Sequence, residues 1–142
     1  MEAMNGNVKK VHILRLDPGE LLLESIHSYL NENNIKNAYV ASGIGTLSDC
    51  ILHMVTTTGF PPIEHFEHWY DKPLELASLS GIVADGIGHL HTVISDCEKA
   101  YAGHVEPGCK VLYLAEIVIL EIDVPMKRFV NEINLKQLMP ED

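Results

Sequence analysis

Alternation of apolar and polar residues along most of this chain predicts a protein built mainly of β-strands. Successive side chains of a strand point to opposite faces, so a period of two indicates a sheet with at least one covered face. Turn-forming residues at 57–62 and 71–73 separate several of these segments. The predicted strands span residues 11–16, 38–42, 50–56, 63–70, 74–83, 88–95 and 110–122.

One segment departs from this period and predicts an amphipathic helix. Asp17 is in position to cap it, Pro18 suits the first turn, and Glu20 completes a capping-box pattern. Apolar residues then recur on one helical face, and the polar stretch 31–34 ends the helix. The predicted apolar stripe consists of Leu22, Leu23, Ile26 and Leu30. Near the carboxyl end, residues 126–138 are predicted to form a terminal helix or an extended tail.

The strand at 110–122 is apolar on both faces, which affects the expected assembly. A strand of a small antiparallel sheet normally meets solvent on one side, so two apolar faces require a helix layer on one side and another layer or subunit on the other. Glu116 interrupts the apolar run. A carboxylate there is expected to be paired or to belong to a site, because burying an unpaired charge is costly. The alternative is that Glu116 marks the end of a strand at a subunit edge.

Length and composition limit the classes of protein to consider. A chain of 142 residues predicts one domain, and its formal net charge of −10 opposes broad non-specific binding to nucleic acid. Three cysteines form no paired framework and favour a reducing compartment. The first residues lack the apolar core of a signal peptide, and no apolar run approaches the roughly 18 residues of a membrane span. We therefore expect a soluble, cytoplasmic protein without a membrane partner.

Three of the eight histidines fall in an arrangement that suits one metal ion. On a strand, His89 and His91 share a face with Cα atoms about 6.6–6.8 Å apart. An antiparallel hairpin centred on Cys97 and Glu98 places His91 directly opposite His104, and directly opposed residues share a face. Three imidazoles then converge and leave a fourth position for water, as in open zinc sites. Imidazole also suits Cu, Fe or Ni, so zinc is favoured without excluding another transition metal.

Other interpretations of these residues remain open at the level of the sequence. Two histidines on one strand face are often only a polar surface, and Cys97 or Cys109 is a possible rival ligand. His65 and His68 would meet on a helix but point to opposite faces of a strand, so we interpret their segment as a solvated or subunit-edge surface. The two glycines at 43 and 45 are not followed by a phosphate-binding motif.

Six short motifs in order along nearly the whole chain resemble the plants and prokaryotes conserved (PPC) domain. They are RLDPGE at 15–20, GIGTL at 43–47, LELASLSG at 74–81, HLH at 89–91, AGH at 102–104 and AEIVI at 115–119. The resemblance implies a single α+β domain over residues 8–138, with a largely antiparallel sheet flanked by a few helices and assembled as a homotrimer. Residues 1–7 and 139–142 are then flexible termini. It also implies a metal site of His89, His91 and His104.

The chain departs from the family pattern in two respects. Ala102 stands where the family usually has the first of two glycines before the third histidine, a small change that leaves the site intact. Plant members have an AT-hook with an RGRP core, which this chain lacks, so it resembles the standalone prokaryotic members. DNA binding by the hook is therefore not inherited, and we expect this chain alone to bind DNA weakly or not at all.

Two functional hypotheses follow. In the first, the protein is a zinc-binding homotrimer with a small-molecule or hydrolytic role, with Glu116 as the first candidate general base. In the second, the metal is structural and the trimer is a regulatory module that binds DNA or protein partners. A cupin is set aside, because Ser95 and Asp96 stand where a cupin has its glutamate. The sequence identifies neither a small-molecule ligand nor an enzymatic reaction.

Overall fold

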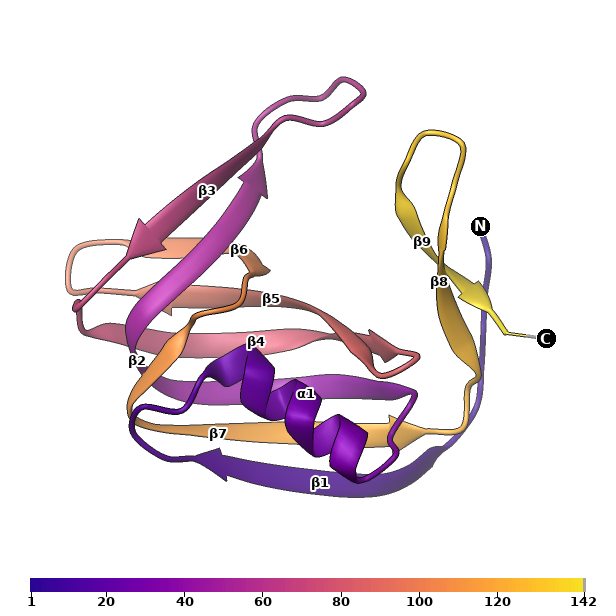
Figure 1. The fold of residues 1–142 in the computed structure, drawn as a ribbon, viewed down its shortest axis with the longest axis horizontal. Helices are drawn as coiled ribbons and strands as arrows, with labels where there is room; N and C mark the ends of the chain where they lie inside the picture. The colour runs from indigo at the N-terminus through magenta and orange to yellow at the C-terminus, as the bar shows by residue number, and fades with distance from the viewer. Residues whose placement is uncertain (142) are drawn as a thin grey trace.

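The computed structural model describes residues 1–141 and consists of nine strands and one helix in that range (Figure 1). The helix α1 spans Leu22–Glu32. The strands are β1 (Val8–Leu16), β2 (Ala38–Val55), β3 (Glu64–Trp69), β4 (Leu74–Ala84), β5 (Ile87–Ser95), β6 (Ala100–Val105), β7 (Lys110–Ile122), β8 (Met126–Val130) and β9 (Lys136–Pro140). An α+β fold with a mostly antiparallel sheet is confirmed.

Seven strands form one sheet that curls back on itself. Its order is β1-β7-β2-β4-β5-β6, and all of its pairs are antiparallel. The second part of β2 also pairs with β6 and with β3, so β2 closes the sheet at the end opposite to β1. A separate hairpin of β8 and β9 stands beside the sheet (Figure 1).

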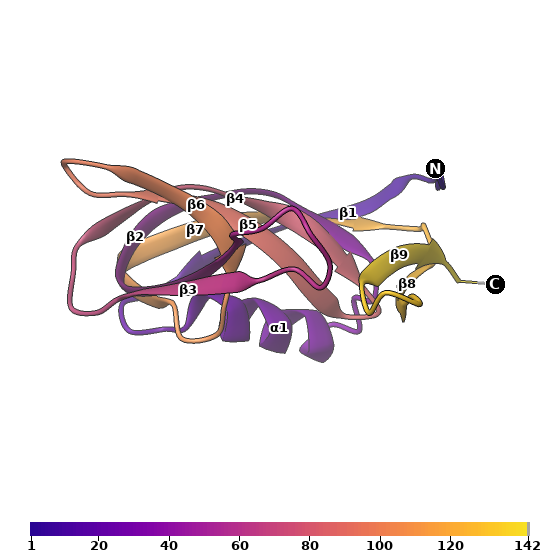
Figure 2. The same cartoon turned by 90° about the horizontal axis from the view of Figure 1, so that it is seen from above.

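The hydrophobic core lies between α1 and the curled sheet. The four residues of the predicted apolar stripe are all buried: Leu22, Leu23, Ile26 and Leu30. They share the core with sheet residues such as Ile117 and Ile119 of β7. Figure 2 shows α1 on one side of the sheet, and the structure has no helix in residues 1–141 on the other side. The core therefore covers only one face of β7.

The opposite face of the sheet is open and partly apolar. Direct cross-strand neighbours share a face, and one such row crosses five strands. The row consists of Val11, Leu120, Tyr39, Ile82 and His89. Next to it, Ile13 is 76% exposed. The second apolar face predicted for the strand at 110–122 thus lies uncovered in the single chain. The row of residues on this face ends at His89.

Three sequence-based predictions were wrong in detail. The predicted strands 38–42 and 50–56 form one strand, β2, whose register shifts near Ser42, Leu47 and Asp49 accommodate the glycine segment. Residues 126–138 form neither a helix nor an extended tail but most of the β8–β9 hairpin. The resemblance implied a few flanking helices, but residues 1–141 contain one helix.

The predicted start of the helix at Asp17 was also wrong. Glu20 does accept a hydrogen bond from the Asp17 backbone N–H, at 2.6 Å, but this contact closes a turn before the helix. The Gly19 N–H donates to the Val111 carbonyl at 2.9 Å, and the Leu22 N–H donates to the Cys109 carbonyl at 2.8 Å. These bonds hold the segment in line with the start of β7, so the helix begins only at Leu22.

Contacts continue on both sides of residues 8 and 138, the limits predicted for the domain. The Asn7 side chain donates to Asp123 at 3.2 Å, and β9 continues to Pro140. Asp142, part of the segment predicted to be flexible, lies outside the described residues. Within residues 1–141, no helix is both long and apolar enough to cross a membrane.

Close packing of β4 against β5 makes Gly81 a sensitive position for stability. A Cβ atom at residue 81 would overlap the backbone carbonyl oxygen of His89 on the paired strand. We expect Gly81→Ala to lower the free energy of unfolding by about 1–3 kcal/mol, as overpacked core sites do. Urea denaturation measures the change. Gly59→Ala is the control, because a Cβ there meets nothing within 4 Å, and equal stability of the two variants would contradict the prediction.

Candidate metal centre

The hairpin of β5 and β6 has the register predicted from the sequence. His91 of β5 lies opposite His104 of β6. The Asp96 carboxylate fixes the turn by accepting hydrogen bonds from the Glu98 and Lys99 backbone N–H groups, both at 2.8 Å. Cys97 is exposed in this turn, as predicted. The local sequence thus determines which residues face each other across the hairpin.

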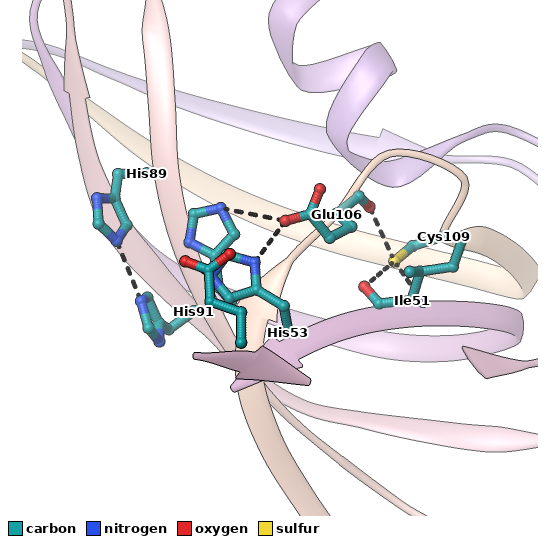
Figure 3. A network of polar contacts seen from close by, with 8 residues as sticks. Ile51, His53, His89, His91, Glu106 and Cys109 are labelled. Carbon is teal, nitrogen blue, oxygen red and sulfur yellow. Dashed lines mark hydrogen bonds and ion pairs between the residues drawn. The ribbon is translucent and has the colours of Figure 1, made fainter. Parts of the chain in front are cut away.

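The structure brings the imidazoles of His89, His91 and His104 together on the outer face of the curled sheet. The Nε2 atoms of His89 and His91 are 3.1 Å apart (Figure 3). The ring of His104 stands edge-on to both, with centroids 4.8 Å from His89 and 5.4 Å from His91. One nitrogen from each ring lies within 4.8 Å of the other two.

This arrangement fits a transition metal. Zinc–nitrogen bonds of about 2.0–2.1 Å in tetrahedral geometry place two ligand nitrogens about 3.3 Å apart. The separation of the His89 and His91 nitrogens, 3.1 Å, is close to this value. Imidazole nitrogens as the donors favour Zn, Cu, Fe or Ni over Ca or Mg.

The surroundings keep the three rings neutral. Partial desolvation lowers the pKa of His89 and of His91, although both keep exposed edges. The pKa of His104 falls to about 4, chiefly through burial and then through the nearby His53. A neutral imidazole has a free nitrogen lone pair, which a metal needs. At neutral pH all three rings are therefore available as ligands.

Two further residues, His53 and Glu106, join the cluster and were not predicted from the sequence. His53 of β2 lies opposite His104 of β6, and their rings stack with centroids 4.4 Å apart. The Nδ1 atom of His53 is 2.5 Å from Oε1 of Glu106, which is itself 4.0 Å from Nε2 of His104 (Figure 3). His53, His104 and Glu106 thus form a second group of potential ligands that shares one histidine with the first.

Strand β3 borders the same cluster. Nε2 of His53 lies 3.8 Å from Oε1 of Glu64, and the ring of Phe66 packs against His53 with centroids 5.3 Å apart. Half of the Phe66 surface remains exposed. The site therefore has two carboxylates and one aromatic ring on the side of His53.

Glu116 does not belong to this cluster. It is exposed on β7, opposite Arg15 of β1 and Ile44 of β2, whereas the cluster lies on β5, β6 and the far end of β2. Within the single chain, Glu116 is therefore not placed to act as the general base of this site. Glu106 is the carboxylate that stands beside the imidazoles.

The two candidate rival ligands lie elsewhere. Among residues 1–141, neither Cys97 nor Cys109 joins a group of potential metal ligands. Cys109 is buried, with its sulfur 3.7 Å from that of Cys50. The Cys109 sulfur also accepts a hydrogen bond from the Ile51 N–H at 3.3 Å (Figure 3). Cys50 and Cys109 thus belong to the core behind β2, the strand that carries His53.

His65 and His68 form the exposed edge surface that the sequence predicts. They lie on β3, which within residues 1–141 pairs with β2 alone. His65 pairs with Glu67 at 3.0 Å, and His68 contacts the Tyr70 hydroxyl at 2.9 Å. Neither joins the group of potential ligands within the described part of the chain.

The sequence held one usable signal for the missed residues. Glu106 follows His104 by two residues, one residue beyond the end of β6, so the alternation of an extended chain puts both on one face. His53 had no such signal, because its approach depends on pairing between β2 and β6, whose partners are about fifty residues apart in the sequence. Long-range pairing of this kind leaves no local pattern.

Comparisons with known proteins agree with this fold. The sequence profile described as the Plants and Prokaryotes Conserved (PCC) domain matches residues 3–123. A bifunctional protein GlmU of Synechococcus is 33% identical over 122 residues, and a second one is 30% identical over 114 residues. These stretches cover 84% and 79% of this chain but only 18% and 17% of the two GlmU proteins. The chain thus spans less than a fifth of the length of these curated relatives.

Several solved structures share the fold over nearly the whole chain. A metal-containing protein of Archaeoglobus fulgidus has a TM-score of 0.84 and 25% identity, covering 98% of this chain and 99% of its own. A PPC protein of Pyrococcus horikoshii has a TM-score of 0.80 and 21% identity, with 100% and 99% covered. A putative DNA-binding protein of Bacteroides thetaiotaomicron has a TM-score of 0.82 and 16% identity, with 99% and 98% covered.

Proposed function

We propose that this protein, which belongs to the Plants and Prokaryotes Conserved domain family, binds one transition-metal ion per chain through His89, His91 and His104. The observation that supports this most directly is the convergence of three neutral imidazoles on one face of the β5–β6 hairpin, with 3.1 Å between two of their nitrogens. The Archaeoglobus fulgidus neighbour is a metal-containing protein. Zinc is the metal that we favour, because three histidines with an open fourth position are typical of its open sites.

The residues around the proposed metal suit a role in hydrolysis or another reaction of a small molecule. Bound zinc lowers the pKa of a water ligand to ~7. Glu106, paired with His53 at 2.5 Å, is placed to accept a proton from a group held beside His104. Phe66 contributes an apolar border next to His53. Glu106 therefore takes the general-base role for which the sequence suggested Glu116.

Metal analysis tests the ligand assignment. We expect one zinc per chain in protein purified without a histidine tag, and loss of most of it in His89→Ala and in His104→Ala, because each variant lacks one of three ligands. Inductively coupled plasma mass spectrometry measures the stoichiometry. His65→Ala is the matched control, since His65 is an exposed strand histidine outside the cluster. Full zinc content in both site variants would refute the assignment.

We also propose that the protein is a homotrimer in a reducing, cytoplasmic compartment. The open face of the sheet exposes apolar side chains such as Ile13 and Ile44, which a neighbouring subunit would cover. The row of Val11, Leu120, Tyr39 and Ile82 ends at His89, so that subunit would also approach the metal centre. Three-fold assembly is what the family resemblance implies, and the free cysteines fit a reducing compartment.

Light scattering coupled to size-exclusion chromatography tests the assembly. We expect the mass of a trimer for the wild-type chain at micromolar concentration. Ile13→Glu is expected to shift the mass towards the monomer, because it places a charge on the proposed contact face. Lys99→Glu, in the exposed β5–β6 turn, serves as the control and should leave the mass unchanged. A monomeric wild type would contradict the proposal, and a dimer would contradict the three-fold stoichiometry.

A regulatory DNA-binding role is the alternative, because the Bacteroides thetaiotaomicron neighbour is named a putative DNA-binding protein. The net charge of −10 opposes this role for the present chain. We therefore propose that the chain alone does not recognise DNA sequence.

Titration of labelled duplexes at increasing salt distinguishes the two roles. At physiological salt we expect no sub-micromolar binding to any one sequence in the presence of excess competitor DNA. Binding that appears only at low ionic strength is consistent with this expectation, because a few clustered lysines produce it on an acidic protein. Tight binding to one sequence that survives competitor would establish the alternative.

A further inference from the structure

Arg128 lies on a strand at the end of the sheet where β5, which carries His89 and His91, begins. Among the described residues this strand pairs with β9 and with no strand of the main sheet. Arg128 belongs to β8, opposite Leu138 of β9. In both overall views the β8–β9 hairpin stands at the end of the sheet where β4 turns into β5 (Figures 1 and 2). Strand β8 packs against β4 there, and His89 lies near the start of β5.

The guanidinium of Arg128 is partly buried and makes no ion pair with residues 1–141. Its Nε atom is shielded from solvent and has no hydrogen-bond acceptor within the described residues, and no carboxylate in residues 1–141 is near enough for an ion pair. Arg15, the other arginine of the chain, is largely exposed and pairs with Asp17 at 3.0 Å. Desolvating a charge without a counter-ion costs free energy, and such a charge fits an external anion.

Arg128 lies on the His89 side of the histidine cluster. Its strand, β8, packs against β4, and Ile82 of β4 lies directly opposite His89. At the other end of the cluster, the carboxylates of Glu64 and Glu106 lie within 4 Å of His53. The site therefore has a positive side next to His89 and a negative side next to His53.

We propose that Arg128 binds the oxyanion group of a small ligand whose neighbouring part lies at the metal position on His89, His91 and His104. This inference rests on the proposed metal-binding function. A guanidinium presents its N–H donors as a fork that matches two oxygens of one carboxylate or phosphate group. Glu64 and Glu106 repel a negative group, so the oxyanion lies towards Arg128 and a neutral or hydrogen-bond-donating part of the ligand lies towards Glu106.

Calorimetric titration of the zinc-loaded protein tests this inference, with inorganic phosphate and acetate as separate probes. We expect at least one probe to bind the wild type, and Arg128→Gln to weaken that binding tenfold or more. We expect Arg128→Lys to bind the anion with an affinity between those of the wild type and Arg128→Gln, because lysine keeps the charge but lacks the fork of N–H donors. Arg15→Gln is the matched control and should bind like the wild type. Comparing the two probes shows whether the site takes a phosphate or a carboxylate.

Zinc content, measured before either anion is added, distinguishes failure of the proposed metal site from failure of the proposed anion binding by Arg128. A wild type without zinc contradicts the proposed function itself. A zinc-loaded wild type that binds neither anion, or a folded Arg128→Gln that binds as tightly as the wild type, overturns only the role of Arg128. If thermal unfolding shows that Arg128→Gln does not fold, Arg128→Lys decides, and wild-type affinity in that variant overturns the role of the guanidinium fork.

Discussion

Backbone pairing along β2 is the constraint on which the rest of the structure depends. This 18-residue strand pairs with β7 and β4 along its first part and with β3 and β6 along its second part. A buried strand must satisfy its N–H and C=O groups on both edges, so β2 bends where its register shifts and passes from one set of partners to the other. The bend curls the sheet, places β6 against β2, and brings His53 onto the ring of His104. The cluster of imidazoles is therefore completed by the path of one strand.

Local rules predicted much of this structure. The period of two located most strands, and the Cys97–Glu98 turn set the register that places His91 opposite His104. These features depend on residues close in the sequence, whose geometry is nearly fixed. The features that were missed depend on tertiary contacts. The start of α1 is set by hydrogen bonds from the turn to the beginning of β7, and His53 reaches the site only because β2 pairs with β6. Propensity and pattern contain no information about such partners.

Charge and burial give this site a distribution of charge that the net charge of the chain does not reveal. The protein has a net charge of −10, yet Arg128, on the side of the cluster nearest β8, pairs with no carboxylate in residues 1–141. On the other side, Glu106 is already engaged by His53. Partial burial keeps the imidazoles neutral, so they act as donors and not as cations. The chemistry proposed here thus arises from local placement and would be missed by any argument from overall composition.

The β8–β9 hairpin is structurally separate from the sheet that carries the metal ligands. Its two strands pair with each other and not with the seven-stranded sheet. The family profile ends at residue 123, before β8 begins, although the Archaeoglobus fulgidus structure covers 98% of this chain. The metal ligands therefore lie within the span of the family profile, and the residue proposed to bind the anion lies outside it, on a separate sheet. With the proposed role of Arg128, a substitution in the hairpin would change anion binding while the sheet and its three histidines stay the same.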